Sequence, residues 1–204
     1  MKFAKLISYI FHPGFMPTLV MLVLFNLDTY FRFSVSPGLK KFILGLVFIN
    51  TFLFPLLILV FLKSRNAIDS FELKNRKNRI IPFGVSTLFF FFTYNFMRET
   101  SLPPIILSIF LGISLSMFIV FITSFFYKTS IHMVGVSGLL ASILCLYVKF
   151  SANYLLEIST VTLIWGLVGY SRLKLKSHSV DEVYVGAGIG LVCVIIPAYF
   201  NIMI

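Results

Sequence analysis

The chain is poor in charge, in cysteine and in histidine, the residues on which most soluble enzymes and metalloproteins depend. Only 12% of its 204 residues are charged, and it has seven acidic residues, three histidines and two cysteines. Cys145 and Cys193 both lie inside apolar runs, so we interpret them as core residues and not as a disulfide or a ligand pair. The sparse histidines and acids form no His-x-x-Glu-His pattern and predict no metal site.

Two common catalytic motifs are also missing from the sequence. It has no Gly-rich nucleotide loop and no Gly-x-Ser-x-Gly nucleophile elbow. These absences argue against nucleotide binding and against the chemistry of the α/β-hydrolases.

Apolar residues, by contrast, are abundant. The chain is 59% hydrophobic, has a mean hydropathy of +1.00 and contains 25 phenylalanines. A soluble domain is only about 45–50% apolar, and a soluble globule could not hide this much apolar surface. The composition therefore predicts an all-α integral membrane protein, with residues 1–204 as one domain.

The apolar runs predict a polytopic bundle of six or seven transmembrane helices. A run at 80–97 is shorter than the others but almost uncharged. The N-terminal region 3–31 is interrupted by His12-Pro13-Gly14 and by Pro17, and is either an interfacial helix followed by a short span or one kinked span. The runs long enough to cross a bilayer are 39–62, 103–127, 132–149, 154–170 and 183–204.

The net charge of +10 indicates an anionic partner. The cations lie in short loops between the apolar runs and form no separate basic domain, so membrane lipid headgroups or a phosphate ligand are favoured and nucleic acid is not. The short loops and the lack of soluble extensions favour a bacterial inner (cell) membrane.

Three polar clusters are predicted to meet on one face of the membrane. If each apolar run crosses once, the loop 63–79, the start of the run 132–149 and the end of the run 154–170 all lie on the same side. An active site needs this kind of convergence, whereas scattered loop charges do not. The clusters are Arg76 and Arg79; Lys128, Ser130 and His132; and Ser171, Arg172, His178 and Glu182.

The third cluster carries the clearest chemical pattern. His178 and Glu182 are four residues apart, so on a helix the carboxylate reaches one ring nitrogen and leaves the other free to attack. Asp181 is an alternative partner. Arg172 supplies a planar fork suited to a phosphate.

The other two clusters have alternative interpretations. Arg76 and Arg79 are three residues apart and grip a phosphate, or else belong to a basic loop that binds headgroups. His132 is placed to protonate a leaving group, or else it lies at the interface beside a snorkelling lysine.

His12 is far from the clusters in sequence, and we interpret it as interfacial. Gly186 and Gly190 predict close packing of the last helix against a neighbour.

The motifs resemble those of the type 2 phosphatidic acid phosphatase family over about residues 60–204. Ser171-Arg172, five residues, His178, three residues and Glu182 resemble the family's Ser-Arg-x5-His-x3-Asp, with Glu in place of Asp. Ser130-Ile131-His132 keeps the Ser-x-His of its Pro-Ser-Gly-His motif. The first motif, Lys-x6-Arg-Pro, is matched only loosely around Arg79.

The resemblance implies a membrane lipid phosphatase that forms a phosphohistidine. His178 would be the nucleophile, Glu182 would orient it, and His132 would protonate the leaving group and then activate water. No metal or cofactor would be needed, and the substrate would be a lipid phosphate or a polyprenyl pyrophosphate. The alternatives are a non-catalytic member that binds, transports or flips an anionic lipid, and a membrane assembly subunit. The resemblance implies phosphate contacts from Arg172, Ser130, Arg79, Arg76, Lys128 and Ser171.

Overall fold

The computed structural model describes residues 2–28, 31–71, 73, 75–151 and 153–202 and is all-helical. Helices make up 79% of the described residues, among which no strand occurs. The helices are α1 (Lys2–Ile10), α2 (Met16–Asn26), α3 (Phe31–Ser34), α4 (Pro37–Phe48), the π-helix η1 (Ile49–Leu53), α5 (Phe54–Ser64), the 3-10 turn η2 (Lys77–Arg79), α6 (Ile80–Arg98), α7 (Pro104–Thr123), α8 (Ile131–Phe150), α9 (Leu155–Lys174) and α10 (Val180–Phe200).

Five of the predicted spans are confirmed as helices long and apolar enough to cross a membrane. The longest is the continuous 28-residue segment Pro37–Ser64, in which η1 joins α4 to α5. The other four are Lys77–Arg98, Pro104–Thr123, Ile131–Phe150 and Val180–Phe200.

The predicted count of six or seven spans is not reached by length and composition alone. α9 has 20 residues, but it carries Glu157 near one end and Arg172 and Lys174 near the other and is less apolar than the five. The N-terminal region forms two short helices, α1 with nine residues and α2 with eleven, separated by a turn. At about 1.5 Å per residue, neither can cross a 30 Å hydrocarbon core alone.

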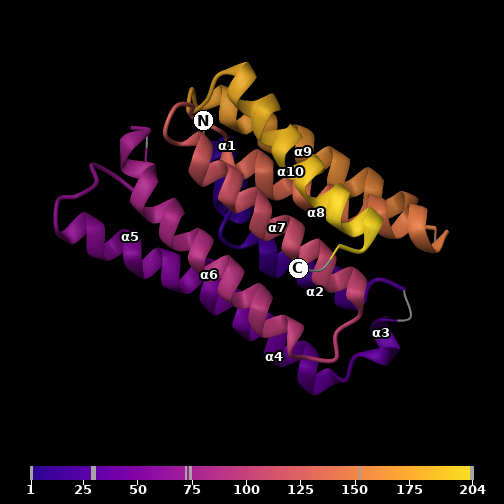
Figure 1. Ribbon diagram of the computed structural model, residues 1–204. Coiled ribbons are helices and arrows are strands. Elements are labelled where there is room, and N and C mark those ends of the chain that lie inside the picture. The colour runs from indigo at the N-terminus through magenta and orange to yellow at the C-terminus, as the bar shows by residue number, and fades with distance from the viewer. Residues whose placement is uncertain (1, 29–30, 72, 74, 152, 203–204) are drawn as a thin grey trace.

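The bundle has a polar end, which we define as the end where α6, α8 and α10 begin and α9 finishes. In Figure 1 the N-terminus lies near the turn between α9 and α10, and α3 lies at the opposite end of the bundle. α1 contacts α9, and beyond α2 the carbonyl of Asp28 accepts a hydrogen bond from the hydroxyl of Tyr154, at the start of α9. The pair α1–α2 thus runs from the polar end to the opposite end.

Helix α7 occupies the centre of the bundle. Within an apolar stretch of 18 residues, 67% of the residues are buried in α7, against 22% in Pro37–Ser64. Figure 1 shows α4, α5 and α6 on one side of α7 and α8, α9 and α10 on the other. Segment Pro37–Ser64 therefore presents most of its surface outward, as a lipid-facing helix does.

Glycines allow α10 to approach its neighbours closely, as the sequence predicts for Gly186 and Gly190. A Cβ atom on Gly186 would lie 2.6 Å from the carbonyl oxygen of Ser130, and one on Gly190 would overlap the carbonyl oxygen of Val134. A Cβ atom on Gly112 of α7 would lie 2.5 Å from the carbonyl oxygen of Cys193. α10 is therefore packed backbone to backbone against α8 and α7, in the manner of small-residue contacts between membrane helices.

Candidate functional site

Hydrogen bonds join the three polar clusters at the polar end. The Arg79 guanidinium donates through Nη1 to the carbonyl of Thr129 at 2.8 Å, and the Lys128 ammonium donates to the carbonyl of Ser177 at 2.8 Å. The backbone N–H of Ser130 donates to the carbonyl of Glu182 at 3.2 Å. Residues about 50 positions apart in the sequence are thus held in one assembly.

His178 and Glu182 form the shortest contact of the assembly. Nδ1 of His178 lies 2.6 Å from Oε2 of Glu182. Because an ionised carboxylate can only accept, Nδ1 carries the hydrogen and Nε2 of the neutral ring keeps its lone pair. The family motif that this segment resembles has Asp at this position. The longer Glu182 side chain also places its carboxylate at hydrogen-bonding distance from the ring.

A helix cap fixes the carboxylate in place. Ser179 and Glu182 form a capping box at the start of α10: the Ser179 hydroxyl accepts from the Glu182 N–H, and the Glu182 carboxylate accepts from the Ser179 N–H, both at 3.3 Å. The same Oε2 therefore serves the cap and the imidazole. The sequence Ser-x-x-Glu contains this signal, which places Glu182 without reference to any family.

The imidazole of His178 is held in its neutral form. Burial, together with the positive charges of Arg79, Arg172 and Lys128, lowers the pKa of His178 to about 3. A hydrogen bond with the Lys128 backbone acts in the opposite direction and does not reverse the shift. A neutral ring at pH 7 is the form that a nucleophile requires.

We expect the His178 ring to remain neutral when the detergent-solubilised protein is titrated from pH 8 to pH 5. Nitrogen-15 NMR of labelled histidine measures this directly, and His178→Gln assigns the signal. Because the unfolded chain binds this proton near pH 6.5 and the folded chain only near pH 3, each pH unit of acidification below about 6.5 should cost up to about 1.4 kcal/mol of stability. A midpoint near 6.5 for the assigned signal would contradict the expected environment.

Arg79 is buried and partly committed to the protein itself. Its guanidinium makes two hydrogen bonds to the backbone. Nε donates to the carbonyl of Leu73, in the loop that precedes α6, at 2.9 Å, and Nη1 donates to the carbonyl of Thr129. Only 4% of the residue is exposed, yet it lines the cavity described below. Arg79 therefore links the loop to α8 and also presents positive charge to a ligand.

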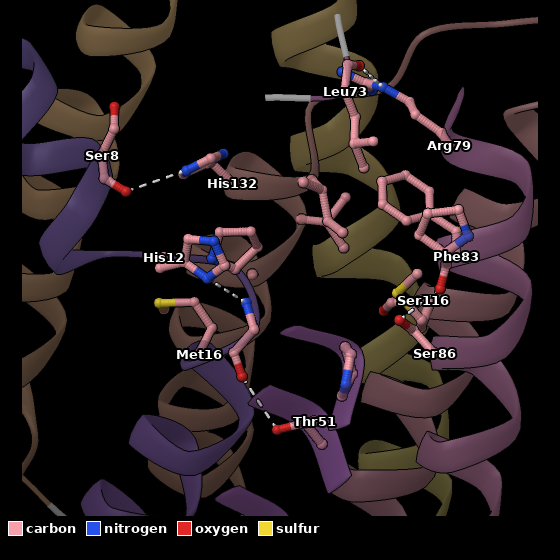
Figure 2. Close-up of a pocket in the computed structure, with 18 of the residues that line it drawn as sticks. Ser8, His12, Met16, Thr51, Leu73, Arg79, Phe83, Ser86, Ser116 and His132 are labelled. Carbon is pink, nitrogen blue, oxygen red and sulfur yellow. Dashed lines mark hydrogen bonds between the residues drawn. The ribbon is translucent and has the colours of Figure 1, made fainter. Parts of the chain in front are cut away.

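Helix α1 enters the site through Ser8. The Ser8 hydroxyl accepts from Nη1 of Arg172 at 3.0 Å, and the Ser8 carbonyl lies 3.3 Å from Nε2 of His132. The ring of His12 lies beside that of His132, with a centroid distance of 6.2 Å (Figure 2). His12, which is far from the three clusters in sequence and is interpreted above as interfacial, therefore lies beside a member of one of them and lines the cavity described below.

A pattern in the sequence could have identified this contribution. Lys5 and Ser8 are three residues apart, the spacing of one helix face, and both line the cavity together with His12, which follows the end of α1. The site is accordingly not confined to residues 60–204. The distance in sequence between α1 and the clusters hid the relation.

Three predicted phosphate contacts do not line the cavity. Arg76 is half-buried, and Ser171 is buried with its hydroxyl donating to the carbonyl of Leu167. Ser130 is fully buried, and its hydroxyl has no hydrogen-bond partner among the described residues. Lys74, a neighbour of Arg76 in the basic loop, lies outside the described residues.

A cavity of about 780 Å³ connects the polar clusters with the interior of the bundle. It is of the size that binds small molecules in proteins. All three histidines line it. The cations that line it are Lys5, Arg79, Lys128, Arg172 and Lys176.

The opposite wall of the cavity is apolar and extends along the helices. Phe90 lies eleven residues beyond Arg79 on α6, and Val194 lies sixteen residues beyond His178 on α10. Phe83 lies across the cavity from His12 in Figure 2, with Ser86 and Ser116 nearby. The combination of a cationic end and an apolar wall suits an amphiphilic anion.

No family model, no curated protein and no solved structure matches the chain.

Proposed function

We propose that the protein is an integral-membrane phosphatase that hydrolyses a lipid phosphate or a polyprenyl pyrophosphate through a phosphohistidine. The observation that carries the proposal is the neutral, carboxylate-oriented imidazole of His178, located at the cationic end of a cavity whose other wall is apolar. The headgroup would lie among the cations, and the tail would lie along the apolar wall.

The reaction would proceed in two steps. Nε2 of His178 attacks phosphorus, the bond from phosphorus to the leaving oxygen breaks, and His132 gives that oxygen a proton. Water then attacks the phosphohistidine while His132 accepts its proton, the P–N bond breaks and phosphate departs. Arg79, Arg172 and Lys128 stabilise the negative charge that the phosphoryl oxygens carry during transfer.

The proposed arrangement in the membrane has seven crossings. α9 crosses because the chain must return from the far end of α8 to the polar end before α10 begins. α1 and α2 together form a broken span, since they run from the polar end to the opposite end. The short connections favour a bacterial inner membrane as the location.

A second candidate function is the binding or transfer of an anionic lipid without turnover. One observation favours it: Nε2 of His132 lies within hydrogen-bonding distance of the Ser8 carbonyl, and the Ser130 hydroxyl is buried away from the cavity. The cationic part of the site is thus complete while the leaving-group acid is engaged elsewhere.

Phosphate release separates the two functions. Detergent-purified protein, with EDTA present, should release phosphate from at least one member of a panel of lipid phosphates and prenyl pyrophosphates. Quenching in base during turnover should trap an acid-labile phosphate on the peptide that contains His178. Lipid binding without any release or trapped phosphate would support the second candidate.

A further inference from the structure

The turn between α1 and α2 is held in place by hydrogen bonds and is not a frayed helix end. The backbone N–H of Gly14 donates to Nδ1 of His12 at 3.3 Å, and the hydroxyl of Thr51 donates to the carbonyl of Gly14 at 3.1 Å (Figure 2). Thr51 belongs to the π-helix η1, a type of distortion that frequently occurs at functional sites. Thr51 is 1% exposed, so the turn is anchored inside the protein.

The turn fixes which nitrogen of His12 faces a ligand. Because Nδ1 accepts a hydrogen bond from Gly14, the hydrogen of the neutral ring is on Nε2. The contacts of the described residues give Nε2 no hydrogen-bond partner, and the residue lines the cavity. The ring is held edge-on between Phe52, at a centroid distance of 5.6 Å, and His132.

Nε2–H of His12 is thus an oriented donor inside the bundle without a partner among the described residues. A ligand can supply the missing acceptor. Polar side chains in broken transmembrane helices are costly unless they serve a ligand or a water-filled space. The ring of His12 lies beside that of His132, whose Nε2 is 3.3 Å from the Ser8 carbonyl, and the Ser8 hydroxyl accepts from the guanidinium of Arg172. A ligand oxygen that reaches Nε2 of His12 is therefore next to the groups proposed to handle the phosphate.

We propose that His12 is a ligand-binding residue whose Nε2–H donates a hydrogen bond to an oxygen of the phosphate-bearing headgroup. This inference rests on the proposed function for the identity of the headgroup. It makes the N-terminal broken helix a part of the binding site. It also gives the cavity a neutral donor in addition to its cations.

Two substitutions separate ligand binding from support of the turn. In His12→Asn, Oδ1 replaces Nδ1 as the acceptor from Gly14 N–H, as in an Asx turn, but the side chain is too short to donate where Nε2 does. In His12→Gln, the amide nitrogen reaches the position of Nε2, but the local acceptor is lost. The two variants therefore remove opposite halves of what the imidazole provides.

Calorimetry with decylphosphonate measures binding without turnover, because its P–C bond offers no leaving oxygen. At pH 8 in detergent, we expect His12→Asn to bind this probe about 10- to 100-fold more weakly than the parent, which is the effect of a lost hydrogen bond to a charged group. His12→Gln should bind nearly as tightly as the parent while it unfolds at a lower temperature.

The opposite ranking, with Asn binding normally and Gln binding weakly, would assign His12 to the turn alone and overturn the inference. Equal affinity in all three proteins, or no binding of decylphosphonate by the parent, would overturn it as well. Hydrolysis is measured separately with decyl phosphate. Binding that depends on His12 in a protein that releases no phosphate would reject the proposed catalysis and leave the inference in place.

Discussion

His178→Ala should lower kcat for phosphate release by about 10⁴-fold or more, because the covalent route has no other attacking atom. Nδ1 of the imidazole is oriented by a carboxylate, the Oε2 of Glu182 at 2.6 Å, so Nε2 is the proposed attacking atom. Single-turnover measurements of phosphate release with the best substrate of the panel test this. Decylphosphonate affinity is the control, and it should change far less than kcat.

Glu182→Gln provides the matched comparison for this prediction. The glutamine oxygen can still accept from Nδ1–H, so the ring keeps its orientation but loses the negative charge that stabilises it during phosphoryl transfer. We expect a smaller loss of kcat than in His178→Ala. Turnover that survives in His178→Ala would show that the nucleophile lies elsewhere.

Gly190→Ala should destabilise the protein, whereas Gly188→Ala, two residues away on the same helix, should not. A Cβ atom at Gly190 would overlap the Val134 carbonyl and lie 2.9 Å from Cβ of Ser137, but one at Gly188 meets nothing within 4 Å. Forcing a methyl group into a packed contact typically costs about 1–3 kcal/mol. Alanine at an open helical position gains up to about 1 kcal/mol over glycine.

Thermal unfolding in detergent measures the difference between the two glycine variants. For a chain of this size, 1 kcal/mol corresponds to about 2–4 °C in Tm, so Gly190→Ala should unfold several degrees below the parent and Gly188→Ala at or above it. Phosphate release measured well below both transitions is the accompanying control. Equal Tm values for the two variants would contradict the close contact between α8 and α10.

The parts of the fold that the sequence predicts are those that depend on apolar length alone. Five runs are helices within a few residues of their predicted limits, because uncharged segments of about 20 residues have few alternatives in a bilayer. Whether the N-terminal region and α9 cross the membrane is harder to predict from the sequence, since broken or partly polar helices depend on packing against neighbours. The π-helix at Ile49–Leu53 precedes Pro55, which cannot donate to the carbonyl of Thr51 four residues earlier. The proline marks an irregularity in the helix, but it does not specify a π-helix.

The site was predictable where local spacing determines geometry. His178 and Glu182 meet because they are four residues apart beside a helix cap, and counting the membrane crossings indicates which loops come together. Ser8 and His12 were missed because their contacts span more than 100 positions of the sequence. Burial of Ser130 behind Gly186 depends on how closely two helices approach, which no spacing reveals.

The long helix Pro37–Ser64 also sets a depth scale. The cations Lys41 and Lys63 bracket 21 uncharged residues, which span about 32 Å, close to the thickness of a hydrocarbon core. Thr51 lies ten residues from one and twelve from the other, so in a bilayer that matches this length it would lie near the midplane; it also anchors the turn that carries His12. A lipid whose headgroup reaches that turn must sink well below the plane of its neighbours, so bilayer thickness would regulate how readily the site is occupied.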